Sequence, residues 1–131
     1  EDIRKFESLG TRSFAIEQAI GQALQFHRMI GAELKQKRLQ YLKNYWAEQV
    51  QQLPGVQVKT SLRPEFACAL ALVLVEGKTP AEVQGFLFRE FKIHTVAIEW
   101  ENIKGVRITP NVYTTKDDLD VLVRAFRAMV G

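Results

Sequence analysis

FACALALVLV, residues 66 to 75, is a continuously apolar stretch bounded by Glu65 and by Glu76-Gly77. An apolar run of this length is typical of a strand buried on both faces, although a buried helix has the same periodicity. Cys68, the single cysteine of the chain, lies in this run and is expected to be a small buried hydrophobic residue. The stretch predicts a strand at the centre of a sheet.

A helix is predicted directly after this strand. Thr79 is a suitable capping residue, Pro80 suits the first turn, and Glu82 stands three residues after the cap. Together they form a capping-box pattern. The helix should end near Phe91, and it should bury the apolar side chains of Val83, Phe86, Leu87 and Phe91.

Three further stretches have the alternating or β-branched character of strands. VQVKT, 56 to 60, precedes the apolar run, and IHTVAIEW, 93 to 100, follows the helix. VRIT, 106 to 109, comes after a polar connection of hairpin length, 101 to 104. Together with the apolar run, these stretches predict a sheet of about four strands.

The last helix opens with the capping-box pattern Thr115-Lys116-Asp117-Asp118. Asp117, Asp118 and Asp120 lie at its start, where the helix dipole favours acidic groups. We therefore interpret them as capping residues and not as a carboxylate site. The apolar face of this helix consists of Leu119, Leu122, Phe126 and Met129.

Two longer helices are predicted ahead of the sheet. From Ser13 to Ile30, apolar residues recur at three- and four-residue steps on one face, and Thr11 is a candidate cap. After a break at Gly31, a second amphipathic pattern runs from about Ala32 to Leu53. Four charged residues fall mainly outside its apolar stripe and are expected on its wet face: Lys35, Lys37, Lys43 and Glu48.

This order of elements predicts an α+β fold. We expect a mostly antiparallel sheet of about four strands, with helices packed chiefly on one face and a long helical lead-in before it. The other face of the sheet would then be free to contact a partner.

The composition narrows the possible classes of protein. The chain has 131 residues, of which 47% are apolar and 25% charged, the balance of a globular domain. No run has the roughly 18 to 20 apolar residues of a membrane span, and the N-terminal residues lack the apolar stretch of a secretory signal. We expect a cytoplasmic protein that binds no membrane. The net charge of +3 is too small to favour nucleic-acid binding.

The residues do not form a catalytic constellation of their own. No P-loop, GxGxxG or GxSxG pattern occurs. His27 lies on the apolar stripe of the first long helix, and His94 begins a strand without a cysteine or carboxylate at metal-ligand spacing. The single cysteine excludes an internal disulfide.

Two polar features remain as candidate binding groups. Gly10-Thr11 stands just ahead of a long helix, whose N-terminus is able to receive a phosphate, although it is also an ordinary cap pattern. Arg107 alternates with Val106 and Ile108, so it should point away from the helices if those two residues face them. It is either a solvated strand arginine or a bidentate ligand for a carboxylate or phosphate.

Four segments, in this order, resemble the C-terminal part of class V aminotransferase-type enzymes, which use pyridoxal phosphate on the fold type I scaffold. They are FESLGTRSFAIEQAIGQALQF, IGAELKQKRLQYLKNYWAEQVQQLPGVQV, FACALALVLVEGKTPAEVQGFLFREFKIHTVAI and GVRITPNVYTTKDDLDVLVRAF. The branch that the chain resembles most contains the isopenicillin N epimerase-like proteins. The last segment, an arginine strand with a tyrosine turn and an acid-capped helix, is the most specific.

The resemblance implies a role for both polar features. Arg107 would bind the substrate α-carboxylate, and Gly10-Thr11 would reach the cofactor phosphate of the other subunit in a homodimer. Residues 1–12 would be a segment from a missing large domain, and residues 13–131 the small domain. The lysine that holds pyridoxal phosphate lies in the large domain of such enzymes, so we expect no catalytic residue, no bound cofactor and no activity in this chain alone.

Two departures from the family pattern bear on the substrate. Asn111 replaces a frequent histidine and Thr114 replaces a frequent asparagine, which leaves the substrate and the reaction subtype open: transamination, epimerisation or elimination. A cysteine-bearing loop of the desulfurase kind is absent. The alternative hypothesis is a free-standing α+β binding or protein-interaction module. Nucleic-acid binding through the basic second helix ranks last.

Overall fold

The structure is a computed structural model of the chain, and it describes residues 3–6, 10–11 and 13–131. The chain divides into two compact units, Glu1–Leu34 and Lys35–Gly131. Among the described residues, no helix combines the length and the apolar composition that a bilayer crossing requires.

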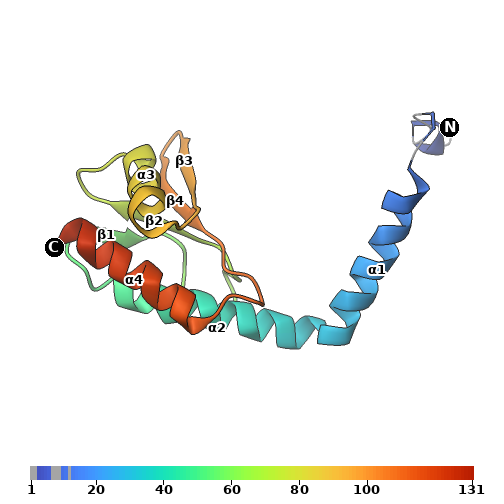
Figure 1. Cartoon of the computed structure of the whole chain (residues 1–131), viewed down its shortest axis with the longest axis horizontal. Helices are drawn as coiled ribbons and strands as arrows, with labels where there is room; N and C mark the ends of the chain where they lie inside the picture. Colours follow the sequence, from blue (N-terminus) through green and yellow to red (C-terminus); the bar gives the residue numbers. More distant parts are fainter. Residues whose placement is uncertain (1–2, 7–9, 12) are drawn as a thin grey trace. The chain divides into compact units, whose positions relative to one another are not determined.

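The first unit is helical. It contains the short 3-10 helix η1 (Ile3–Phe6) and the helix α1 (Phe14–Ile30), and Figure 1 shows α1 as a single rod. Gly31, at φ +83°, ends α1 as predicted, and its N–H donates to the carbonyl of His27. None of the residues 14–30 is buried. The predicted apolar stripe of α1 is therefore exposed in this chain.

The second unit has an α+β fold, as predicted. Its sheet has the strand order β1-β2-β4-β3, and every neighbouring pair is antiparallel. Its elements are α2 (Ala32–Val50, whose first turn begins before the unit), β1 (Val56–Val58), β2 (Ala71–Val75), α3 (Pro80–Phe91), β3 (Val96–Trp100), β4 (Ile103–Ile108) and α4 (Lys116–Val130). Figure 1 shows this order of helices and strands along the chain.

One face of the sheet forms the core together with the helices. Val73 lies opposite Val106, and Ala71 lies opposite Ile108, on the buried side of β2 and β4. These residues share one hydrophobic cluster with side chains from all three helices of the unit, including Trp46, Val83, Leu87, Leu122 and Phe126. The prediction that the helices pack chiefly on one face is confirmed.

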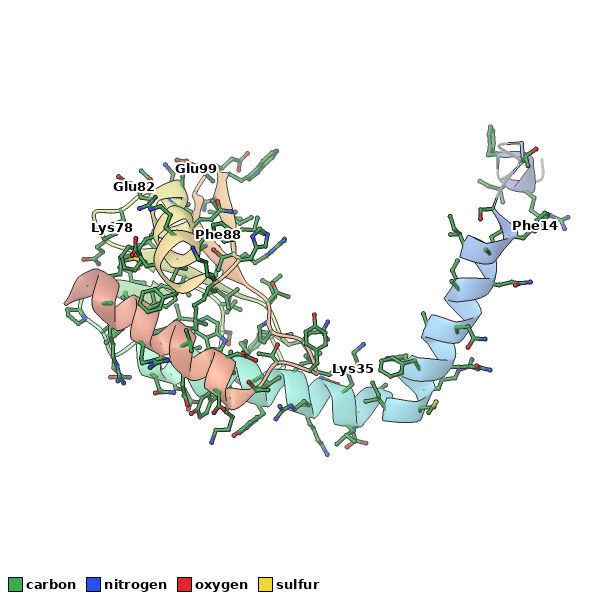
Figure 2. The ribbon with its side chains drawn as sticks, viewed as in Figure 1. Phe14, Lys35, Lys78, Glu82, Phe88 and Glu99 are labelled. Atoms are coloured by element: carbon green, nitrogen blue, oxygen red, sulfur yellow. The ribbon has the colours of Figure 1, made fainter. Side chains whose placement is uncertain are left out.

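Local capping starts α3 and α4 where the sequence predicts. Thr79 Oγ1 accepts from the N–H of Glu82 at 3.3 Å, and the Glu82 carboxylate accepts from the N–H of Thr79 at 2.7 Å. Glu82 is labelled at this end of α3 in Figure 2. Within α3, Val83 and Leu87 are buried and Phe86 and Phe91 are half-buried. The exposed Phe88 projects away from the helix in Figure 2.

The apolar run that suggested a ten-residue strand forms a strand only from Ala71 to Val75. Its burial alternates, because helices cover one face of the sheet and leave Leu72 and Leu74 half-buried on the other. Residues 66–70 precede the strand in an irregular segment, where Phe66 is 69% exposed. The prediction of a strand buried on both faces is therefore wrong.

Cys68 lies in this irregular segment and is exposed. The prediction of a buried cysteine is wrong for the same reason, since it depended on the strand continuing through residue 68. Apolar residues that follow one another in sequence are all buried only where other elements cover both faces of their segment.

Lys43 also departs from the prediction. It was expected on the wet face of the second helix, but its side chain is completely buried. Its Nζ donates to the carbonyl of Ser61 at 2.7 Å, because the irregular segment that follows β1 crosses this face of α2. Burial lowers the pKa of the Lys43 ammonium.

The β3–β4 hairpin is tighter than predicted. Trp100 lies opposite Ile103, so only Glu101 and Asn102 remain in the turn. Glu101 adopts φ +48°, as two-residue hairpin turns of the mirror-image types require. The expected connection of residues 101–104 was too long, because Ile103 and Lys104 already belong to the ladder of β4.

Candidate functional site

Arg107 lies near the end of β4, between two other strands. It pairs with Leu72 of β2 on one side and with Val96 of β3 on the other. Its sequence neighbours Val106 and Ile108 are buried against the helices. Because side chains alternate along a strand, Arg107 points to the opposite face, which we call the open face.

The Arg107 side chain is half-buried and incompletely satisfied. Its Nε is buried and has no hydrogen-bond partner among the described residues. A buried N–H without a partner is costly, and such groups in folded proteins call for an explanation. A planar anion that binds the guanidinium edge would satisfy Nε and one terminal nitrogen together.

The open face around Arg107 is mainly apolar. Leu72, Leu74, Val96 and Ile98 share it and are half-buried. Trp100, at the far end of β3, is 68% exposed. Apolar surroundings strengthen the interaction of a guanidinium with an anion once a second surface excludes water. The open face therefore combines one guanidinium with apolar side chains.

A compact turn follows β4. Thr114 N–H donates to the carbonyl of Asn111 at 2.9 Å, and Asn111 N–H donates to Thr114 Oγ1 at 2.9 Å. The two residues that depart from the family pattern thus close this turn between them. Tyr113 at its tip is 79% exposed.

The next residues cap α4. Thr115 and Asp118 form a reciprocal capping box, and the Asp118 carboxylate accepts from the Thr115 hydroxyl at 2.7 Å and from its N–H at 2.9 Å. These hydrogen bonds lower the pKa of Asp118. Asp118 is thus a capping residue, as predicted. Asp120 instead accepts from the Tyr45 hydroxyl at 2.7 Å, which ties α4 to α2.

Helix α2 supplies polar side chains that sequence reasoning missed. Arg38 Nη2 donates to the carbonyl of Thr114 at 3.1 Å. Gln40 donates to the carbonyls of Pro64 and Ala67, and Asn44 donates to that of Leu62. These partners lie far away in sequence, so no local sequence pattern could have shown which carbonyls the side chains of α2 contact.

Gly10 and Thr11 lie in the first unit, ahead of α1. Both are exposed, and Gly10 adopts φ +88°. Thr11 is not the helix cap, because α1 begins at Phe14 and Ser13 occupies the N-cap position. Among the described residues, Ser13 makes no side-chain cap hydrogen bond, and its carbonyl accepts from the N–H groups of Ile16 and Glu17.

The two histidines of the chain lie in different surroundings. His27 is half-buried and His94 is exposed, and the ring centroids of His94 and Phe88 lie 6.4 Å apart in an edge-to-face arrangement. Within the described part of the chain, no group of three histidine, cysteine or acidic residues could hold a metal ion. The fully buried lysine, Lys43, is engaged with Ser61.

The fold is similar to that of a known class of enzyme. The crystal structure of an alanine–glyoxylate aminotransferase from Nostoc sp. matches 84% of this chain with a TM-score of 0.65 and 19% sequence identity. The match covers 29% of that chain. At this identity the likeness concerns the fold.

A sequence relative points to the same class. Isopenicillin N epimerase from Streptomyces clavuligerus is 27% identical over 130 residues, which is 98% of this chain and 33% of that protein. No protein-family model matches the chain. Both relatives are class V aminotransferase-like, so the resemblance inferred from the four sequence segments is confirmed. The chain spans about a third of the curated relative that it matches.

Proposed function

We propose that this chain is the small domain of a pyridoxal-phosphate-dependent enzyme of class V type, which acts at the Cα of an amino acid. The observation that carries the proposal is the half-buried Arg107, whose Nε has no hydrogen-bond partner among the described residues. Its position in a segment that resembles the closing motif of the family supports the same function.

Arg107 binds the substrate α-carboxylate in this proposal. Two parallel N–H groups of a guanidinium match the two carboxylate oxygens, which fixes the orientation of the amino acid as well as its position. Arg107 is paired with Leu72 on one side and with Val96 on the other, which fixes the position of its backbone in the sheet. The contribution of Arg107 is therefore orientation of the Cα and neutralisation of the carboxylate charge.

Gly10 and Thr11 contact the cofactor phosphate of a partner subunit in this proposal. The left-handed backbone of Gly10, the exposed Thr11 hydroxyl and the start of α1 are suited to this contact. Pyridoxal phosphate supplies an electron sink for the bond that is broken at Cα. A large domain supplies the lysine that holds it, and we expect the assembled protein to be a cytoplasmic homodimer.

The proposal is tested by replacing Arg107 in the full-length protein that carries this chain. We expect Arg107→Met to raise the KM for the amino-acid substrate by about 100-fold, because a charge-assisted pair is lost. Arg107→Lys should recover only part of this loss, since an ammonium does not bind a carboxylate bidentately. Arg124→Met, at an exposed arginine of α4, is the matched control. An unchanged KM in Arg107→Met would contradict the proposal.

A second test uses the chain by itself. Because we propose that the cofactor-holding lysine lies elsewhere, added pyridoxal phosphate should give no stoichiometric, borohydride-reducible adduct on a specific lysine. Such an adduct would favour a different function for this chain.

The alternative function is a free-standing interaction module. The apolar open face and the exposed stripe of α1 favour it, because exposed apolar patches mark contact surfaces. The two functions differ in the coding sequence upstream of Glu1. A region encoding a cofactor-binding lysine supports the enzyme, and a start codon near Glu1 supports the module.

A further inference from the structure

Arg38 connects α2 to the turn that follows the Arg107 strand. Its Nη2 donates to the Thr114 carbonyl at 3.1 Å, across 76 positions of sequence. The Arg38 side chain is half-buried, and its guanidinium lies 5.8 Å from the ring centre of Tyr41. The cation–π contact and the hydrogen bond together favour this position of the guanidinium.

The turn that Arg38 contacts is internally closed. Besides the two bonds between Asn111 and Thr114, the N–H of Val112 donates to Asn111 Oδ1 at 2.8 Å. These hydrogen bonds make the turn a rigid unit. Of the hydrogen bonds described for residues 110–114, that of Arg38 is the one that comes from another element. Arg38 thus fixes the turn to the body of the domain.

The position of this turn affects Arg107 directly. Ile108 is the last ladder residue of β4, and the buried Pro110 begins the turn. Only two residues separate Arg107 from Pro110, so a displaced turn pulls on the end of the strand that carries the guanidinium. The Arg107–Leu72 and Arg107–Val96 pairs hold β4 between β2 and β3. They do not fix the backbone that follows Ile108.

Helix α2 also contacts the segment that leads into β2. Gln40, Lys43 and Asn44 donate to backbone carbonyls of residues 61–67. This segment leads into β2, where Leu72 lies opposite Arg107. Helix α2 thus fixes both the segment that enters β2 and the turn that leaves β4.

We propose that Arg38 is a positioning residue for the carboxylate-binding Arg107. It acts by holding the 110–114 turn, and with it the end of β4, in the position at which the Arg107 guanidinium meets its ligand. This inference rests on the proposed function of Arg107. Arg38 itself does not touch the substrate.

The experiment is a double-mutant cycle in the full-length protein. Arg38→Met should raise the KM for the amino acid about tenfold, the effect of one lost hydrogen bond to a charged group, and kcat should change much less. In an Arg107→Met background, Arg38→Met should raise KM no further, because its effect passes through Arg107. Arg38→Lys should restore part of the affinity, since an ammonium can still donate to the Thr114 carbonyl.

Arg124→Met is the matched control and should leave KM unchanged. Hydrogen exchange of the peptide that spans residues 109–115 should be faster in Arg38→Met and normal in the control. An unchanged KM in Arg38→Met, or an increase of the same size with and without Arg107, would overturn the inference. An unchanged KM in Arg107→Met would instead overturn the proposed function, so the two failures are distinguishable.

Discussion

Leu72 of β2 and Arg107 of β4 lie directly opposite each other on the open face of the sheet. An aliphatic residue thus pairs with a guanidinium whose Nε is buried and has no hydrogen-bond partner in the part of the chain that the structure describes. Cross-strand pairs usually contribute to stability through complementary contacts. This pair therefore gives the Arg107 guanidinium no polar partner on β2.

Arg107→Met is therefore expected to stabilise the chain. It removes a buried donor without a partner and replaces it with an apolar side chain of similar length, which should raise the free energy of unfolding by about 1 kcal/mol. Denaturant unfolding measures the difference. Arg124→Met should stay within about 0.5 kcal/mol of the parent. A clear loss of stability in Arg107→Met would show that the arginine already has a partner in the folded chain.

Gly105→Ala is expected to disrupt the centre of the sheet. A Cβ at Gly105 would lie 2.4 Å from the Val73 carbonyl oxygen, and its backbone adopts φ +149°. Both the clash and the backbone conformation oppose a side chain, so the free energy of unfolding should fall by about 3 kcal/mol.

Gly85→Ala in α3 is the control for this substitution. Its Cβ would meet only the flexible end of the Arg89 side chain, and alanine favours a helix over glycine. We expect unchanged or slightly higher stability, measured by the same denaturant titration. Equal effects of the two substitutions would contradict the close approach of β4 to β2.

Lys43 should make stability depend on pH in the alkaline range. Burial lowers its pKa from the ordinary value of 10.5, so between the two values the unfolded chain binds more protons than the folded one. The stability of the parent should therefore rise with pH up to about 10.5. Lys43→Met should lose this rise, which chemical unfolding at a series of pH values will detect. Parallel pH profiles for the parent and Lys43→Met would count against a buried ammonium.

Asp118 should contribute to stability at neutral pH and lose its contribution in acid. Its hydrogen bonds with Thr115 lower its pKa below the ordinary 3.8, so the stabilisation is complete above that value and disappears as the pH falls through the folded-state pKa. Asp118→Asn should lower the melting temperature at pH 7. The melting temperatures of the parent and the variant should converge at low pH. If the two melting temperatures differ by the same amount in acid, the ionised carboxylate of Asp118 is not the source of the stabilisation.

The sequence by itself determined the features that depend on neighbouring residues. The capping boxes of α3 and α4 were predictable because their donors and acceptors lie three residues apart. The alternation around Arg107 was predictable because a strand fixes the directions of successive side chains. The resemblance to the class V enzymes was visible in the order of four segments, and the α+β fold followed from the order of elements.

Only the tertiary structure decided which side chains are buried and which groups meet. Lys43 is buried and Cys68 is exposed because the irregular segment between β1 and β2 crosses α2 instead of extending the strand. The Arg38–Thr114 contact joins residues 76 positions apart, a distance over which periodicity carries no information. Burial and long-range hydrogen bonds depend on how elements pack, and packing is a property of the whole domain.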